Sequence, residues 1–582
     1  MGRGFAARAL FLAAGPWAHL CAQSTRTTER ATVAPSGRQT VACSGQRIDD
    51  IVVYSAAPSV ANLERVPWLA RIARSFHTTT RPDVVRGFML LDVGDGCVEL
   101  RRAESERILR AQPFLADADI YVVPDTSGGV DLEVRTSDEA SIVFGGSVRA
   151  KTPQVSGLLL GNANLGGRGV FLDGGWHYGD GFRGDFTGRL VDYQLLGQPM
   201  VGMLEVDRAS RGGTWRSEVL HPFYTDLQRV AWHVLGGSVD QYIEVRRPDD
   251  LRPSVFLNRD YGDVGGLVRI GAPGRLTLLG ASLTGEDEFS GDRLTTGDTG
   301  IVRDVGPVPG GQYVAHRVIR ANLLYGVRDV HFERHDGLDA LTGPQDVPIG
   351  FQIGGLVGHT VRALGSRDDD TFISADGYAG GSSGIGVLRV QARGEARRIS
   401  GSGVWDGILT SARATHSLQY SSTHVNQVRL EWSAVFRQRT PFQLLSGVPE
   451  AGVRGFEKSD WAGGQRLVAH IEERYLVGKP YNLADAGVAV FADAGRMWAG
   501  DVPFGRTSPV LGSLGISLLV AAPPRSGRTF RADLAFPIGP GANARWTLTF
   551  TNLDRSRFVF REPVDVTENR EPTVPTSIFS WP

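Results

Sequence analysis

The feature that most constrains this chain is a period-two alternation of apolar and polar residues, which begins near Glu139 and continues almost to the C-terminus. The clearest stretch runs from 428 to 436, where every second residue is apolar and Arg429, Glu431 and Ser433 stand between them. Two later stretches, 530–536 and 546–550, repeat the pattern with aromatic residues on the apolar side. Since successive side chains of a strand point to opposite faces, this region is predicted to be all-β.

Alternation alone does not distinguish a soluble sandwich from a transmembrane barrel, because both bury one face of each strand. Two properties favour the barrel. The pattern extends over residues 139–560, which is long for a sandwich, and many polar positions hold arginine. Unpaired charges are costly in a dry core, whereas a solvated lumen accepts them. Outside the N-terminus no run of about 18 apolar residues suggests a membrane helix.

Composition narrows the functional classes. Glycine accounts for 74 of 582 residues and is scattered along the chain, as tight turns and barrel corners require. The formal net charge of −1 gives no electrostatic basis for nucleic-acid binding. The histidines are dispersed and no local catalytic or metal-binding motif stands out, so we expect no enzyme activity, no cofactor and no metal.

The N-terminus is typical of an exported protein. Arg3 and Arg8 precede the apolar stretch Ala9–Ala14, so residues 1–22 are predicted to be a secretory signal. Residues 23–46 are poor in large apolar residues and are interpreted as a flexible linker. The two cysteines beyond the signal, Cys43 and Cys97, either pair in an oxidising compartment or remain as buried thiols.

Residues 47–138 mix helical and strand patterns and are predicted to form a small α+β domain of order β-α-α-β-β. The expected elements are a strand at Ile48–Tyr54, a helix opening at Pro82, a helix at Leu100–Ala111, and strands at Ala118–Val123 and Val130–Thr136.

Three motifs follow one another in the last third of the chain. A Val-Arg-Gly-Phe tetrad lies in a loop, a Glu-x-Arg pair lies in the next strand, and a Phe-x-Asp-x-Gly run lies in the strand after that. In order and spacing they resemble the BamA/TamA superfamily of outer-membrane insertases. The residues are Val453, Arg454, Gly455 and Phe456, then Glu472 and Arg474, then Phe491, Asp493 and Gly495.

The tetrad alone is a weak signal, since Val85–Phe88 repeats it at helical spacing without the companion strands. With its companions it implies a surface-antigen-type antiparallel transmembrane barrel of about 16 strands over residues 139–560. The resemblance also implies that the α+β unit is one POTRA-like domain. Residues 561–582 follow the barrel as a C-terminal tail.

The physics of the motif suggests a lock between the loop and the lumen. Strand parity lets Glu472 and Asp493 both face inward, where a guanidinium from Arg454 would pair with one or both. Gly455 would allow a close backbone approach, and Phe456 would anchor against the wall. The alternative is a solvated arginine in a long surface loop.

The resemblance implies a protein of the Gram-negative outer membrane, with its N-terminal domain in the periplasm, that helps unfolded outer-membrane proteins to fold into the lipid bilayer. One alternative is a two-partner-type export pore of the same superfamily, which would act on a secreted partner. A second alternative is a soluble periplasmic β-rich binding protein.

Overall fold

The fold was taken from a computed structural model. It describes residues 33–56, 78–149, 154–177, 185–209, 212–247, 253–296, 303–308, 315–440, 442–448, 451–456, 461–540, 542, 545–554 and 562–574. The expected signal, 1–22, lies outside these residues. No helix within them is long and apolar enough to cross a membrane.

A small α+β domain comes first in the described chain. Its four-stranded sheet has the order β2-β1-β4-β3, in which β1 runs parallel to β4 and the other neighbours are antiparallel. The expected β-α-α-β-β order is therefore present, with one additional short strand. The elements are β1 Ser44–Ala56, α2 Pro82–Gly87, β2 Gly96–Val98, α3 Glu99–Arg110, β3 Leu115–Pro124 and β4 Val130–Asp138.

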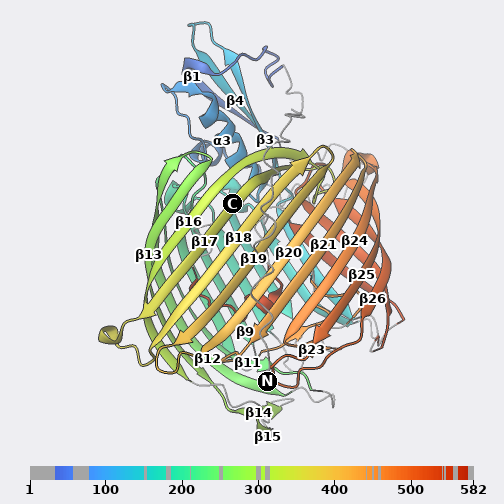
Figure 1. Cartoon of the computed structure of the whole chain (residues 1–582). Helices are drawn as coiled ribbons and strands as arrows, with labels where there is room; N and C mark the ends of the chain where they lie inside the picture. Colours follow the sequence, from blue (N-terminus) through green and yellow to red (C-terminus); the bar gives the residue numbers. More distant parts are fainter. Residues whose placement is uncertain are drawn as a thin grey trace. The chain divides into compact units, whose positions relative to one another are not determined.

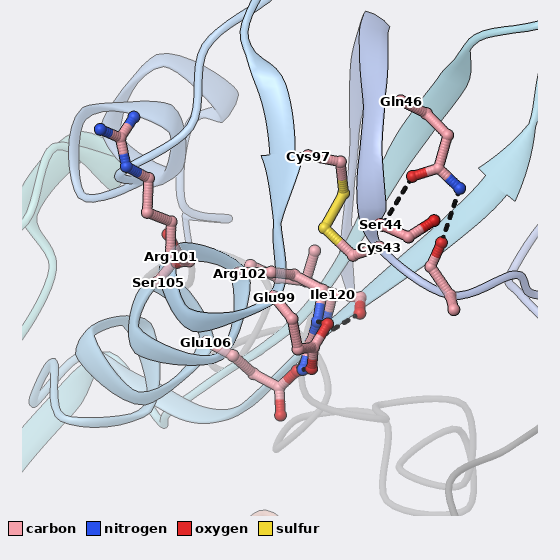
Figure 2. The surroundings of a disulfide bond; sticks show 11 residues. Cys43, Ser44, Gln46, Cys97, Glu99, Arg101, Arg102, Ser105, Glu106 and Ile120 are labelled. Atoms are coloured by element: carbon pink, nitrogen blue, oxygen red, sulfur yellow. Dashed lines mark hydrogen bonds and ion pairs between the residues drawn. A yellow bond between two sulfur atoms is a disulfide. The ribbon is translucent and has the colours of Figure 1, made fainter.

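Alternating apolar residues of β1, β3 and β4 form the core of this domain together with the helices. Val85 and Phe88 of the second tetrad copy are buried in that core, as their helical spacing predicts. Helix α3 is stabilised along its length by ion pairs one turn apart, including Arg102 with Glu106 at 2.6 Å. Figure 2 shows this pair near the disulfide that joins Cys43 to Cys97.

The segment expected as a flexible linker, 23–46, is described from Val33 onward and lies against the domain. Ala34 is buried beside Tyr121 and Val123. The Arg38 guanidinium contacts Asp131 and Glu133 at 2.9 Å each. These contacts correct the linker interpretation for residues 33–46, where a few well-placed side chains bind a segment of generally polar composition.

The described strands from β5 to β28, apart from the short pair β22–β23, form a closed antiparallel barrel (Figure 1). In this ring β28 lies next to β5. The first strands are β5 Ile142–Arg149, β6 Gln154–Asn162, β7 Val170–His177, β8 Asp185–Asp192, β9 Val201–Ala209, β10 Gly212–His221, β11 Val230–Glu244, β12 Ser254–Ala272 and β13 Arg275–Ser290. The later ones are β16 His316–Asp336, β17 Pro344–Thr360, β18 Asp370–Ser383, β19 Gly386–Ile399, β20 Trp405–Ser421, β21 His424–Phe436, β24 Gln465–Gly478, β25 Asp485–Trp498, β26 Leu511–Ala521, β27 Arg528–Ile538 and β28 Thr547–Asp554.

A hairpin extends from the wall between β13 and β16, which pair directly with each other. It consists of β14 Arg293–Thr296 and β15 Arg303–Pro307. Without it the sheet has about 20 strands, more than the expected 16. The difference arises early in the barrel, where β5 to β10 are only 8 to 10 residues long and more strands fit into the same length of chain.

The two faces of the wall differ as the sequence pattern predicts. On β16 the outward Leu323 and Tyr325 are 64% and 51% exposed, whereas the inward Arg320 and Asn322 are buried. The same holds on β21, where Leu430 and Trp432 face outward and Glu431 is buried inside. The barrel is therefore apolar outside and polar inside, the reverse of a soluble β domain.

Two segments of chain lie inside the ring of strands. One, named the lumen loop, comprises the described residues 437–440, 442–448, 451–456 and 461–464 between β21 and β24, and carries the short pair β22 Leu444–Leu445 and β23 Ala462–Gly463. The other is the C-terminal segment 562–574 with the one-turn helix α4 Val564–Thr567. They meet in one apolar cluster, made of Leu409, Val435, Phe442, Leu444, Met497 and Val566.

Candidate functional site

Arg454 projects from the lumen loop onto the inner faces of β24 and β25. Its Nε and Nη2 donate to the two carboxylate oxygens of Asp493 at 2.8 and 2.7 Å, and its Nη1 donates to Glu472 at 2.9 Å. Its backbone N–H also donates to Asp493 at 3.1 Å. The structure thus brings together three residues that are 39 positions or fewer apart in sequence and places them as the lock requires.

Phe491, the aromatic residue of the Phe-x-Asp-x-Gly motif, also contacts the Arg454 guanidinium. The Phe491 ring lies beneath the guanidinium, with its centroid 3.4 Å from Cζ of Arg454. A cation over an aromatic face gains about 0.5–2 kcal/mol, more where water is excluded. The two hydrogen bonds to Asp493 and the contact with the Phe491 ring both require a planar guanidinium group, and lysine has no such group.

Small and apolar residues allow the loop to come this close to the wall. Gly455 has φ of +92°, and a side chain there would press on Pro537 at 3.1 Å. A side chain on Gly495 would approach Val453 to 2.6 Å. Val453 and Phe456 are buried with Val468 of β24 and Leu511 of β26. The two glycines of the motifs therefore make room, while Val453 and Phe456 seal the loop against the wall.

The lock belongs to a larger charged network on the lumen wall. Glu472 also accepts from Arg474 at 2.6 Å and from Arg531 of β27 at 2.8 Å. Arg531 continues to Asp533 and Ser517 at 2.9 and 2.8 Å. Arg474 reaches Gln427 of β21 at 3.0 Å. Glu472 is thus a carboxylate shared by three arginines, and with Asp493 and Asp533 the three positive and three negative charges balance between the loop and the strands β24, β25 and β27.

Sequence reasoning missed part of this network. The motifs predict neither the contact of His470, on the same face of β24, with Asp493 at 2.9 Å nor the contact of Arg531 with Glu472 at 2.8 Å. The available signal was the parity of each strand, which places these residues inward. Parity does not give the register between β24 and β27, because β25 and β26 stand between them.

One group of described residues has metal-ligand spacing elsewhere in the lumen. The ligand atoms of Glu286, Glu288 and His316 lie within 4.8 Å of one another. Arg259 already binds Glu288, and Arg397 lies 3.4 Å from Glu286. These arginines supply the positive charge that an ion would bring, so we assign no metal to this group.

Comparisons with known proteins identify structures of similar architecture. No family model and no curated sequence matches the chain. Among solved structures, BamA from Haemophilus ducreyi lacking POTRA domains 1–3 matches at 12% identity and a TM-score of 0.36, over 87% of this chain and 85% of that one. CdiB from Escherichia coli matches at 11% identity and a TM-score of 0.43, over 87% and 76%. CdiB from Acinetobacter baumannii matches at 12% identity and a TM-score of 0.38, over 87% and 74%.

These similarities are too low to assign the chain to a family or to transfer a function to it.

Proposed function

We propose that this chain is an outer-membrane β-barrel protein of BamA/TamA type that assists the insertion of other outer-membrane proteins. The observation that carries the proposal is the lock of Arg454 on Glu472 and Asp493. Three motifs recognised by their order meet at one point of the lumen, with Phe491, Gly455 and Gly495 shaping the contact.

The outer surface supports a membrane location. Outward positions of the long strands hold exposed leucine, isoleucine, valine and aromatic residues, while the arginines and carboxylates point inward. Such a surface would be unstable in water and is the surface that a bilayer covers. We place the α+β domain in the periplasm as a POTRA-like module, because its strand and helix order matches that module.

The barrel seam offers a physical route for insertion. β28 and β5 close the wall, and the rings of Phe144 on β5 and Phe530 on β27 stack across β28 with centroids 5.1 Å apart. If this seam opens, the unpaired N–H and C=O groups of each edge would template an incoming strand. Client proteins would then enter the bilayer beside the barrel.

An occupied lumen favours insertion at the seam over export through the pore. The lumen loop and segment 562–574 both lie within the ring of described strands. A secreted partner passing through would have to displace them, whereas a strand added at the seam would not. The export pore is therefore the second candidate and not the first.

The test is quantitative proteomics of the outer membrane after depletion of this protein. A broad fall in other barrel proteins, with precursors in the periplasm, is expected, and the wild-type gene should reverse it. Complementation with Arg454→Ala should fail even when the variant reaches the membrane. Arg506→Ala, which alters an exposed loop arginine stacked on Trp461, is the matched control and should restore the wild-type pattern.

Loss of one secreted protein alone, with other barrels unchanged, would instead identify an export pore. Recovery of the native chain in the soluble periplasm would exclude both membrane functions and leave the soluble binding protein.

A further inference from the structure

The segment Glu562–Val574 is acidic and lies on arginines of the lumen wall. It contains four carboxylates and a single arginine. Only Val564, Thr567 and Glu568 of the segment are exposed, and buried carboxylates of the segment contact inward-facing arginines of the strands. Nothing in the proposed insertion activity accounts for this arrangement.

The first anchor is Asp565 in the short helix α4. Arg466 of β24 donates to its two carboxylate oxygens at 2.6 and 3.1 Å. The backbone N–H of Leu445, in the lumen loop, donates to the same carboxylate at 3.0 Å. Arg466 is 2% exposed, so the pair is shielded from water, and it ties the segment to both the wall and the loop.

The second anchor joins Glu562 and Arg570, which are eight residues apart. Arg570 donates to Glu562 at 2.6 Å and to Ser411 of β20 at 2.9 Å. Arg393 of β19 lies 3.3 Å from Glu562, and Glu395 of the same strand lies 3.3 Å from Arg570. Both ends of this internal pair are therefore also bound to the wall.

The third anchor is Glu571, which pairs with Arg397 of β19. Its backbone N–H donates to Glu395 at 3.0 Å, and Thr573 donates to its carboxylate at 2.7 Å. The charged or titratable groups around it come from five wall strands and from Arg439, which follows β21. Those on the strands are Arg259 on β12, Glu286 and Glu288 on β13, His316 and Arg320 on β16, Asp370 on β18, and Glu395 and Arg397 on β19.

Apolar contacts extend the reach of the segment. Val566 is fully buried in the cluster that includes Phe442 of the lumen loop and Met497 of β25. Val574 packs on a cluster of inward residues that runs from Ala231 on β11 to Phe372 on β18. The segment therefore contacts several wall strands, from β16 round to β24, and not a single edge of the lumen.

We propose that Glu562–Val574 is a removable plug, whose acidic side occupies a binding strip of wall arginines at Arg393, Arg397 and Arg466. With the plug seated the pore is closed, and release of the plug opens it and exposes a strip that binds acidic peptide. The inference does not depend on which clients the barrel serves. It concerns the permeability of the lumen, whereas the proposed function concerns the seam.

The experiment measures ion conductance of the purified full-length chain in planar lipid bilayers. The triple variant Glu562→Lys, Asp565→Lys, Glu571→Lys keeps the length of the chain and repels the segment from the arginine strip. Breaking one partner of a buried ion pair shifts an equilibrium on the order of a hundredfold, so the ratio of open to closed time should rise at least that much. Val564→Lys adds the same charge at an exposed position of the same segment and is the matched control.

Two further measurements separate loss of the plug from general damage. A synthetic peptide of sequence 562–574 added to the triple variant should restore the closed level, and the same peptide with its four carboxylates replaced by amides should not. The charge swap Asp565→Arg with Arg466→Asp should conduct less than Asp565→Arg alone, because the pair is rebuilt with its charges exchanged.

The proposal is overturned if the triple variant, shown to be folded by its heat-modifiable mobility, conducts like the wild type. It is also overturned if the peptide with amides in place of carboxylates blocks as well as the native one. If the triple variant does not fold, equal conductance of Asp565→Arg and the charge swap decides against it. None of these outcomes bears on outer-membrane assembly, which the depletion experiment tests separately.

Discussion

Replacement of Arg454 by alanine removes the side chain that holds the lumen loop to two wall strands. The variant leaves Asp493 and Glu472 buried, with 0% and 7% of their side chains exposed, and takes away three guanidinium hydrogen bonds. Removing one partner of a buried ion pair costs about 3–5 kcal/mol. Glu472 keeps Arg474 and Arg531 as partners and His470 still contacts Asp493, so we expect the lower end, about 3 kcal/mol.

A change of this size would raise the fraction of time that the loop is detached roughly a hundredfold. Hydrogen exchange of the amides in 451–456 measures that fraction directly, because exchange follows the open population. Limited proteolysis of the same loop is a second measurement. The barrel strands should keep their protection, since their ladders do not involve Arg454.

Arg454→Lys is the informative companion variant. It keeps the charge but loses the planar fork on Asp493 and the flat contact with Phe491, so exchange should fall between that of wild type and alanine. The reasoning is refuted if the alanine variant shows wild-type exchange at 451–456. It is also refuted if Arg454→Lys and Arg454→Ala are both cleaved by protease at the same rate as the wild type.

Three further predictions concern other parts of the chain. Cys43→Ser with Cys97→Ser should lower the stability of the α+β domain by about 2–4 kcal/mol, measured by denaturant unfolding followed at that domain, and an unchanged midpoint would contradict this. Gly495→Ala places a methyl group 2.6 Å from the buried side chain of Val453, so it should destabilise the seated loop by about 1–3 kcal/mol and increase hydrogen exchange at 451–456. Hydrogen exchange equal to that of the wild type would contradict this. Burial and the negative charge of Glu286 raise the pKa of Glu571 to about 7. The seated segment therefore holds a proton that the released one loses, so conductance should increase as the pH rises from about 5 to 7 and Glu571→Gln should remove that dependence.

Local patterns were sufficient to predict the architecture. Alternation along 428–436 and 530–536 showed which residues face outward, and the structure exposes Leu430, Trp432 and Phe536 as expected. The β-α-α-β-β order followed from helical and strand periods in the same way. These are properties of short stretches of chain, which a sequence displays directly.

The number of strands and the contacts between distant strands could not be predicted from the sequence. The strand number was wrong because the pattern does not show where the short strands β5 to β10 end. Arg531 was placed inward by parity, yet its contact with Glu472 depends on the registers of β25 and β26. The three motifs predicted the contacts of Arg454 with Glu472 and Asp493. They did not predict the other hydrogen bonds of this network.

The C-terminal segment 562–574 shows most clearly that contacts between residues far apart in sequence could not be predicted. The sequence identified it only as a C-terminal tail, because its burial depends on arginines that are far away in sequence, such as Arg466 and Arg397. Each of these arginines is unremarkable within its own strand. Only the closed barrel brings them to one surface, where they match the carboxylates at Asp565 and Glu571.

The most direct test of insertion activity is reconstitution of the full chain into lipid vesicles, followed by the folding rate of a urea-denatured outer-membrane barrel protein diluted into them. We predict that vesicles with the wild-type chain fold the client faster than empty vesicles, and that Arg454→Ala reduces this acceleration while Arg506→Ala does not. Equal rates in wild-type and empty vesicles, with the chain correctly inserted, would contradict the assignment of this barrel as an insertase.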